Sequence, residues 1–471
     1  MSFANLPAEI LLLILDCIDT PAILKAFCLL SKRFRAIAQP LLYRELVLPA
    51  EDIPLSLLLL CRTITTCPSI ATQVRLLDID TQFSEHILSA SDAERRGLSR
   101  SDIGLLKIEA QKLRLNSIDS FESVFWATDS IILPVLLISR FPNLRELFIT
   151  LNPAGLSLLT GLAQARNSII SSPSLSCLGS FDILHLGCFQ DEQGGEIDIS
   201  DITVLLSLLQ LSKIEISDYA SPLDELYSAP VDISDIPLGS LSISTISLCF
   251  SPIGAVGIGK LVESCKALDA FYCGQSDSQT VQMDPHELYS LLLCQRDSLR
   301  VLQLAFQDDT FESSAAPIFN AAQFGSLKEF ASLEYLTVDQ VYLGLEPDLP
   351  SSLSYLAIQN CQTPVAESLN YIASLALTGH LPSLKRVSLH SDNIHPGGML
   401  DLPRRGATDL LFDAACRKLR GSFEGTGIKL RLESDLLAST VRGYADAFEF
   451  GQPGMFWPFI HLEQPRQLSI V

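Results

Sequence analysis

Short apolar segments recur along the chain with the spacing apolar-x-x-apolar-x-apolar. An apolar residue at every second position predicts a strand that buries one face. The ten copies are Val74/Leu77/Ile79, Leu144/Leu147/Ile149, Phe181/Leu184/Leu186, Leu211/Ile214/Ile216, Ile243/Ile246/Leu248, Leu268/Phe271/Cys273, Leu299/Leu302/Leu304, Leu333/Leu336/Val338, Leu353/Leu356/Ile358 and Leu384/Val387/Leu389. From Leu144 to Leu384 the copies are on average 30 residues apart. This spacing predicts one short strand and one helix per repeat.

Helical patterns lie between several of these strands. Two clear cases are Pro285–Gln295, with Leu288, Leu291 and Leu292 on one face, and Ser368–Leu377, with Leu369, Ile372 and Leu375. Such a unit cannot bury its apolar face alone, so neighbours stack with parallel strands on the concave side and helices on the convex side. A doubly wound sheet is the alternative, but ten strand signals without a closing pattern favour an open solenoid. We therefore expect an α/β fold with irregular repeats.

The first fifty residues have the pattern of three short helices. Pro7 suits the first position of a helix whose apolar stripe is Ile10, Leu11, Ile14 and Ile18. Thr20 followed by Pro21 starts a second helix, and Ser31 can cap a third, which Pro40 limits. Three short helices are below the size at which a core is comfortably stable by itself. We therefore expect this module to need a partner.

The same residues resemble the F-box motif. The resemblance covers roughly residues 3 to 48 and rests on Leu6-Pro7-x-Glu9-Ile10-x-x-x-Ile14, Leu30-Ser31-Lys32-Arg33-Phe34-Arg35 and Leu41-Leu42-Tyr43-Arg44-x-Leu46. It implies docking onto the Skp-type adaptor of a cullin-RING ubiquitin ligase of the SCF type, with the rest of the chain presenting a protein substrate. By motif position, the implied adaptor-binding residues are Leu6, Pro7, Ile10, Ile14, Leu30, Ser31, Phe34, Leu42 and Tyr43. Phe34 and Tyr43 stand where the family often has tryptophan.

The repeats resemble a degenerate leucine-rich-repeat array, so the whole chain resembles fungal-type F-box proteins with leucine-rich repeats. Eight residues after the first leucine, where the family favours Asn or Cys, only Asn152 and Cys361 fit. The intervals range from 20 to 37 residues, and the gap between Val74 and Leu144 leaves room for one missed unit.

Three regions follow from these patterns. We assign residues 1–50 to the F-box adaptor-docking module, residues 51–442 to the solenoid and residues 443–471, which are rich in aromatics, to a C-terminal cap or tail. Insertions interrupt the repeats near residues 89–102, 191–201, 218–235 and 395–408. The second and third are acidic. Insertions on solenoid edges can be solvated loops or can carry binding contacts.

Charge and composition narrow the choice of partners. The formal net charge is −21, of which residues 1–50 carry +1 and the remainder −22. The strong negative charge of the residues after 50 argues against nucleic-acid binding and favours a basic protein substrate. No apolar run reaches the roughly 18 residues that span a bilayer, so no membrane partner is expected. Twelve scattered cysteines without a C-x-x-C pair, and the absence of an Asn-x-Ser/Thr acceptor, predict reduced, buried thiols and a cytoplasmic or nuclear location.

The chain carries one candidate phosphate loop. Gly254–Lys260 follows a predicted strand, but Leu261 stands where a phosphate loop needs Ser or Thr, so a glycine-eased turn explains it better. The seven histidines lie far apart, and neither Gly-x-Ser-x-Gly nor His-Glu-x-x-His occurs. We therefore expect no enzyme activity, no catalytic or metal-binding residue and no cofactor. The leading hypothesis is a ligase substrate receptor. The alternatives are a leucine-rich-repeat scaffold without a ligase role and a nucleotide-switched repeat protein.

Overall fold

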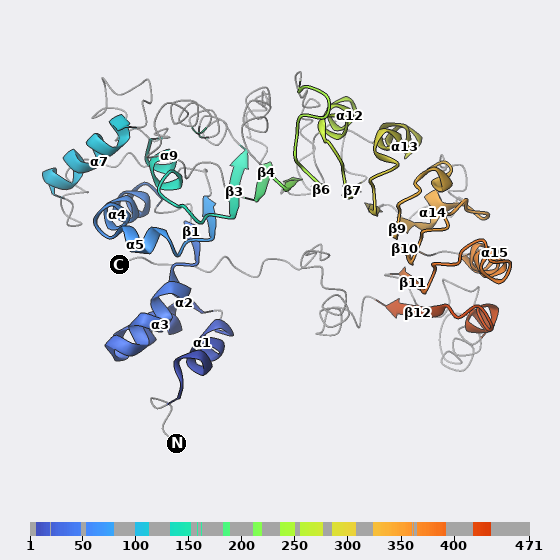
Figure 1. Ribbon diagram of the computed structural model, residues 1–471, viewed down its shortest axis with the longest axis horizontal. Coiled ribbons are helices and arrows are strands. Elements are labelled where there is room, and N and C mark those ends of the chain that lie inside the picture. The colour runs from blue at the N-terminus through green and yellow to red at the C-terminus, as the bar shows by residue number, and fades with distance from the viewer. Residues whose placement is uncertain are drawn as a thin grey trace. The chain divides into compact units, whose positions relative to one another are not determined.

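The structure is a computed structural model of the 471-residue chain, which divides into two compact units (Figure 1). The first unit contains Met1–Ile236 and His461–Val471, and the second contains Pro237–Ile460. We describe each unit by itself. The structure describes residues 6–18, 20–48, 53–79, 99–112, 132–151, 158, 162, 182–188, 211–218, 236–249, 255–276, 285–307, 324–359, 361, 365–391 and 418–434.

The first unit begins with the three predicted helices, α1 (Ala8–Asp16), α2 (Pro21–Leu30) and α3 (Lys32–Leu42). Leu15, Leu24 and Ala38 form their buried core, against which Ile18, Phe27, Cys28, Ile37, Leu41 and Leu42 pack. Ser31 caps α3 as predicted, because the Phe34 backbone N–H donates to its Oγ at 3.2 Å. This bond satisfies one of the free N–H groups at the helix start.

The helix boundaries at two prolines differ from those predicted. Pro40 does not end α3, which continues to Leu42. A proline in the last turn removes only one hydrogen bond, and the turn is held because the Tyr43 N–H donates to the Gln39 carbonyl at 3.2 Å. Pro7 lies at the N-cap of α1 rather than at its first helical position.

A parallel sheet follows in the first unit. Its strands are β1 (Glu45–Leu48), β2 (Leu76–Ile79), β3 (Glu146–Leu151), β4 (Ile183–Cys188) and β5 (Lys213–Asp218), and each pairs with the next in chain order. Between them lie the helices α4 (Ile53–Thr66), α5 (Pro68–Ala71), α7 (Arg100–Lys112) and α9 (Ile132–Ile138). β2 pairs directly with β3, so no strand is inserted between these two in the sheet. The interval that left room for one more unit lies largely outside the described residues.

The second unit continues the same strand–helix alternation. Its strands are β6 (Thr245–Cys249), β7 (Ala270–Ser276), β8 (Val301–Gln307), β9 (Tyr335–Asp339), β10 (Tyr355–Gln359), β11 (Arg386–Ser391) and β12 (Lys429–Ser434), again parallel and paired in chain order. Its helices are α12 (Ala255–Ser264), α13 (Pro285–Leu292), α14 (Gln340–Leu343) and α15 (Val365–Leu377), with 3-10 turns η5 (Leu293–Gln295) and η7 (Leu327–Glu329). Figure 1 shows these helices along one side of the strands.

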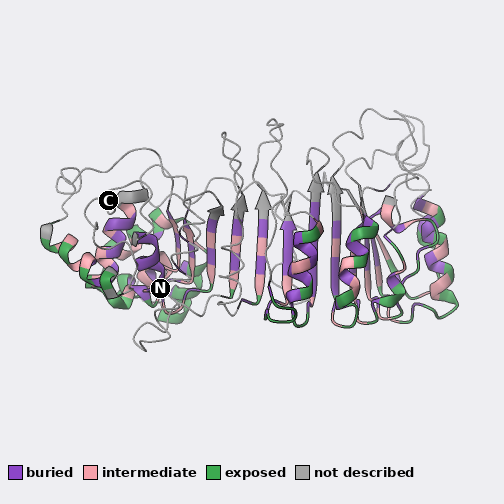
Figure 2. Ribbon diagram, turned by 90° about the horizontal axis from the view of Figure 1, so that it is seen from above, coloured by how far each residue is buried: buried purple, intermediate pink, exposed green. Residues whose placement is uncertain are grey.

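The repeated apolar pattern forms the core of both units. Each of its described residues is buried, and Phe181 lies outside the described residues. Buried and less buried residues alternate along the strands, and the helices turn exposed residues away from the sheet (Figure 2). This mixed α/β arrangement, with parallel strands added one per repeat, is consistent with a solenoid-like repeat.

The pattern missed the strands β1 and β12. Before β12, Gly427 stands where the other copies have their first apolar residue. β1 lies at the end of the F-box resemblance, so its residues were assigned to the helical module. The last residues of that module are therefore part of the sheet.

The glycine-rich segment is a helix rather than a turn. Residues 255–260 form the first part of α12, so the predicted turn is wrong there, and Gly254 lies outside the described residues. A Cβ atom at Gly259 would lie 2.8 Å from Cδ2 of Leu291 in α13. The glycine is therefore explained by the close approach of two helices.

Most predicted insertions lie outside the described residues, namely 89–98, 191–201, 219–235 and 395–408, as does the tail 443–471. Residues 99–102 are described and belong to the start of α7. There the Ser99 N–H donates to Asp102 Oδ2 at 2.8 Å, and the Asp102 N–H donates to Ser99 Oγ at 3.2 Å. This reciprocal cap starts the helix.

In the described part of the chain, none of the helices has the length and apolar character needed to cross a membrane. Eight of the cysteines within the described ranges are free thiols. Cys61, Cys265, Cys273 and Cys361 are buried, whereas Cys17, Cys67 and Cys294 are exposed. The prediction of buried thiols therefore holds only in part.

Candidate protein-docking site

Exposed apolar side chains are concentrated on the first two helices. Of the twelve exposed large apolar residues in the described part of the chain, seven lie in α1 and α2. They are Ile10, Leu12, Leu13, Ile14, Ile23, Leu29 and Leu30, with exposed fractions between 38% and 73%. We call these seven residues the apolar docking face. Apolar patches of this kind mark interaction sites.

The composition of α1 explains why its apolar side chains are not all covered. Residues 10–15 are apolar without interruption, so apolar side chains occur on every side of the helix. Leu11 and Leu15 are fully buried and face the small core, while the residues between them are exposed. A helix that is apolar all round is normally buried. The three-helix module is too small to bury every side of α1 by itself.

The structure divides the nine residues implied by the motif into three groups. Ile10, Ile14 and Leu30 are exposed and belong to the apolar docking face, and Pro7 and Ser31 are exposed beside it in sequence. The half-buried residues are Leu6, Leu42 and Tyr43, and the buried one is Phe34.

Phe34 supports the module from inside. It is only 8% exposed, and its ring centroid lies 5.7 Å from that of Phe27 in α2. Leu42 also packs against the core, and burial raises the pKa of the half-buried Tyr43. These residues therefore position the helices, while the exposed ones are available to a partner.

Motif matching missed four residues of the apolar docking face, namely Leu12, Leu13, Ile23 and Leu29. The uninterrupted apolar run in α1 was the available signal for the first two. The other two lie in α2, a segment from which the motif quotes only the last residue.

Three arginines tie the module together. The Arg33 guanidinium donates to the Leu6 carbonyl, and Arg35 Nε donates to the Cys28 carbonyl at 3.1 Å. Arg44 pairs with Asp16 at the end of α1. Burial lowers the pKa of Arg44, but Asp16 and Glu45 together outweigh this and raise it. These bonds connect α3 with the residues before α1 and with α2, and they connect the end of α1 with the residue before β1.

The module is joined directly to the sheet. The Arg44 carbonyl accepts hydrogen bonds from the N–H groups of Arg75 (2.8 Å) and Leu76 (3.1 Å), where the pairing of β1 with β2 begins. A cavity of about 40 Å³ between the helices and β1 is lined by residues that include Leu15, Pro21 and Val47. Sites for small molecules occupy about 300–1,000 Å³, so this cavity does not suit a cofactor.

Metal chemistry finds no support in the described residues. Within them, no group of three or more His, Cys, Asp or Glu side chains could hold a metal ion. Among the described histidines, His185 lies on β4, His286 in α13 and His390 on β11. His86, His395 and His461 lie outside the described residues.

Comparison with known families identifies the helical module. The F-box-like family model matches residues 3–49, which hold α1, α2, α3 and β1. No curated protein matches the chain. Residues 3–49 therefore form an F-box-like domain. Such a domain suggests a subunit that recruits substrates to a ubiquitin ligase, and proteins of this class are generally receptors rather than enzymes.

Proposed function

We propose that this protein is the substrate-recognition subunit of an SCF-type cullin-RING ubiquitin ligase and has no enzyme activity of its own. The F-box-like domain would dock a Skp-type adaptor, and the leucine-rich-repeat-like strands and helices would bind a protein substrate. The apolar docking face is the observation that supports this most strongly. It lies within the matched residues 3–49, and none of its seven residues belongs to the core that the three helices share.

The exposure of each side chain sets how much it can contribute to the free energy of adaptor binding. Fully burying one Leu or Ile side chain contributes about 1.5–3 kcal/mol. Leu30, which is 67% exposed, would provide much of this on docking, and Ile10 and Ile14, at 42% and 38%, would each provide less than half of it. We assign Pro7 and Ser31 to the edge of the contact, and we assign Leu6, Phe34, Leu42 and Tyr43 to holding the helices in place.

The regions of the chain have separate roles in this proposal. Residues 1–50 dock the adaptor, residues 51–442 bind the substrate, and residues 443–471 form a cap or tail. The complex would act in the cytoplasm or nucleus. Attraction of a basic substrate by the acidic insertions stays a prediction, because those insertions lie outside the described residues.

The test is co-expression with a Skp-type adaptor followed by size-exclusion chromatography and calorimetry. The wild-type chain should elute with the adaptor as a one-to-one complex. Leu30→Asp places an unpaired charge in the apolar contact and should weaken binding by about 2–4 kcal/mol, or roughly 30- to 1,000-fold in Kd.

Leu377→Asp is the matched control. Leu30 and Leu377 are each the last residue of a helix, and they are 67% and 60% exposed. The control should leave adaptor binding unchanged. A folded wild-type chain that does not bind the adaptor would contradict the proposal and favour a repeat scaffold without a ligase role, in which the N-terminal helices only cap the repeats.

A further inference from the structure

The apolar docking face is exposed in the chain by itself. Leu13, Leu29 and Leu30 are its most exposed members, at 63%, 73% and 67%. Soluble monomers rarely leave large apolar patches uncovered. Before an adaptor binds, this face therefore favours contact with another apolar surface.

Each of the two helices that carry the face places an exposed charge beside an exposed leucine. On α1, Glu9 and Leu13 are four residues apart, and on α2, Lys25 and Leu29 are four residues apart. Side chains four positions apart lie on the same side of a helix. All four of these side chains are exposed. The two helices therefore present matching leucines beside charges of opposite sign.

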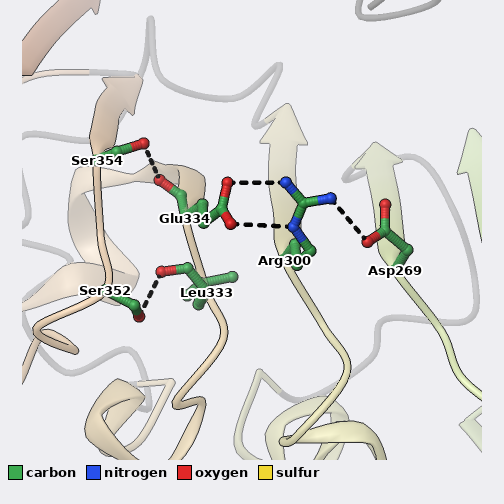
Figure 3. A network of polar contacts seen from close by, with 6 residues as sticks. All are labelled: Asp269, Arg300, Leu333, Glu334, Ser352 and Ser354. Atoms are coloured by element: carbon green, nitrogen blue, oxygen red, sulfur yellow. Dashed lines mark hydrogen bonds and ion pairs between the residues drawn. The ribbon is translucent and has the colours of Figure 1, made fainter. Parts of the chain in front are cut away.

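Glu9 and Lys25 differ from many charges of the chain in having no partner within it. Arg300, for example, donates to both carboxylate oxygens of Glu334, at 3.0 and 2.9 Å, and lies 3.5 Å from Asp269 (Figure 3). Among the described residues, no salt bridge joins Glu9 or Lys25 to an opposite charge. Their charges remain available to another molecule.

Glu9 and Lys25 do not pair with each other within one copy of the chain. Both α1 and α2 pack against α3, which holds them in separate places on the module. In a two-fold dimer, a contact from one copy to the other is repeated in reverse. Placing α1 of one copy against α2 of a second copy would therefore bring Glu9 to Lys25 and Leu13 to Leu29, and would do so twice.

The distribution of charge restricts self-association to this module. Residues 1–50 carry a net charge of only +1, whereas the remainder carries −22. Two bodies of the same strong charge repel each other. A contact between two copies is therefore opposed least where the nearly neutral helical modules meet.

We propose that, without an adaptor, the chain forms a two-fold dimer through the apolar docking face. Glu9 of each copy pairs with Lys25 of the other, and Leu13 of each copy packs against Leu29 of the other. The adaptor of the proposed function requires the same face, so the dimer and the adaptor complex exclude each other. The dimer keeps the face covered until an adaptor replaces the second copy.

The test is sedimentation equilibrium of the full chain without adaptor. The average mass should rise with concentration from that of the monomer, 51.5 kDa, towards twice this value. Leu13→Asp places a charge in the apolar contact of both copies and should weaken the dimer by about a hundredfold or more. Leu377→Asp is the control, because Leu377 is 60% exposed on α15, outside the face. It should leave the dimer unchanged.

Charge reversal tests the arrangement of the two copies. Glu9→Lys turns two attractions into two repulsions and should weaken the dimer about tenfold. Adding Lys25→Glu to the same chain restores opposite charges and should return the affinity to within about threefold of wild type. Glu367→Lys is the control, since Glu367 is also an exposed acidic residue in the first turn of a helix. Circular dichroism checks that each variant keeps its helices.

Three results would overturn the proposal: a monomer at every concentration, a dimer that Leu13→Asp leaves unchanged, or a double charge reversal that binds no better than Glu9→Lys. Adding a Skp-type adaptor should convert the dimer into a one-to-one complex, whereas a complex with two copies of each protein would place the dimer contact elsewhere. An adaptor that does not bind would contradict the proposed function and leave the dimer result standing, because the dimer is measured without it.

Discussion

The side chain of Gln295 connects two consecutive repeats of the second unit. It is 7% exposed, and its Nε2 donates to the carbonyls of Val262 and Cys265, each at 3.0 Å. Its Oε1 accepts a hydrogen bond from the Leu268 N–H at 3.0 Å. One side-chain amide therefore satisfies two backbone carbonyls at the end of α12 and one backbone N–H just before β7.

We predict that Gln295→Leu destabilises the second unit strongly. The leucine keeps the volume but leaves the Cys265 carbonyl and the Leu268 N–H without this partner, whereas the Val262 carbonyl still accepts from the Cys265 N–H at 3.2 Å. These three residues are themselves buried. An unsatisfied buried polar group costs about 1–3 kcal/mol. For two such groups we expect the free energy of unfolding to fall by about 2–5 kcal/mol, since some water can reach the site.

The assay is urea unfolding followed by far-ultraviolet circular dichroism at 25 °C. Gln303→Leu, on the neighbouring strand β8, is the matched control, because no hydrogen bond joins its side chain to another described residue. This control should change stability by no more than about 0.5 kcal/mol. A loss of less than about 1 kcal/mol for Gln295→Leu would show that these backbone groups do not depend on the Gln295 amide.

Two further predictions concern the first unit. Burial raises the pKa of Glu215, but His185 and Lys213 outweigh this and lower it from an ordinary 4.5 to about 2. A lowered carboxylate pKa stabilises the fold above pH 4.5, and this contribution is lost as the pH falls towards 2. Urea unfolding should therefore show Glu215→Gln less stable than wild type by about 3 kcal/mol at pH 7 and equal to it near pH 2; a gap that does not change with pH would contradict this. Ser31→Ala should lower the thermal stability of the helical module by about 1 kcal/mol, whereas Ser31→Asn, which keeps a capping oxygen, should not; equal losses in both variants would show that the cap is unimportant.

Much of the core could be predicted from the sequence. The second and third apolar residues of each pattern copy fall within the strands β2–β11, and Leu288 and Leu369 are buried on helices where the pattern placed them. Side chains in a strand alternate between its two faces, so apolar residues at every second position all lie on the same face. Burying that face fixes which residues form the core.

The parts that failed depend on contacts distant in sequence. Whether Leu11 or Leu12 is buried in α1 depends on how the helix packs on α3, and both have the same hydrophobicity. The helix at Gly259 was missed because glycine usually marks a turn, whereas here it allows the approach of Leu291. The sequence pattern did not reveal how one side chain, Gln295, joins two repeats.

Adaptor docking is tested most directly by hydrogen exchange of the full chain, alone and bound to a Skp-type adaptor. Docking through the apolar docking face predicts slower exchange of the amides of α1 and α2 in the complex, with no change in α15, whose exposed Leu377 is equally apolar. Binding that leaves α1 and α2 exchanging as fast as in the free chain would contradict docking through this face.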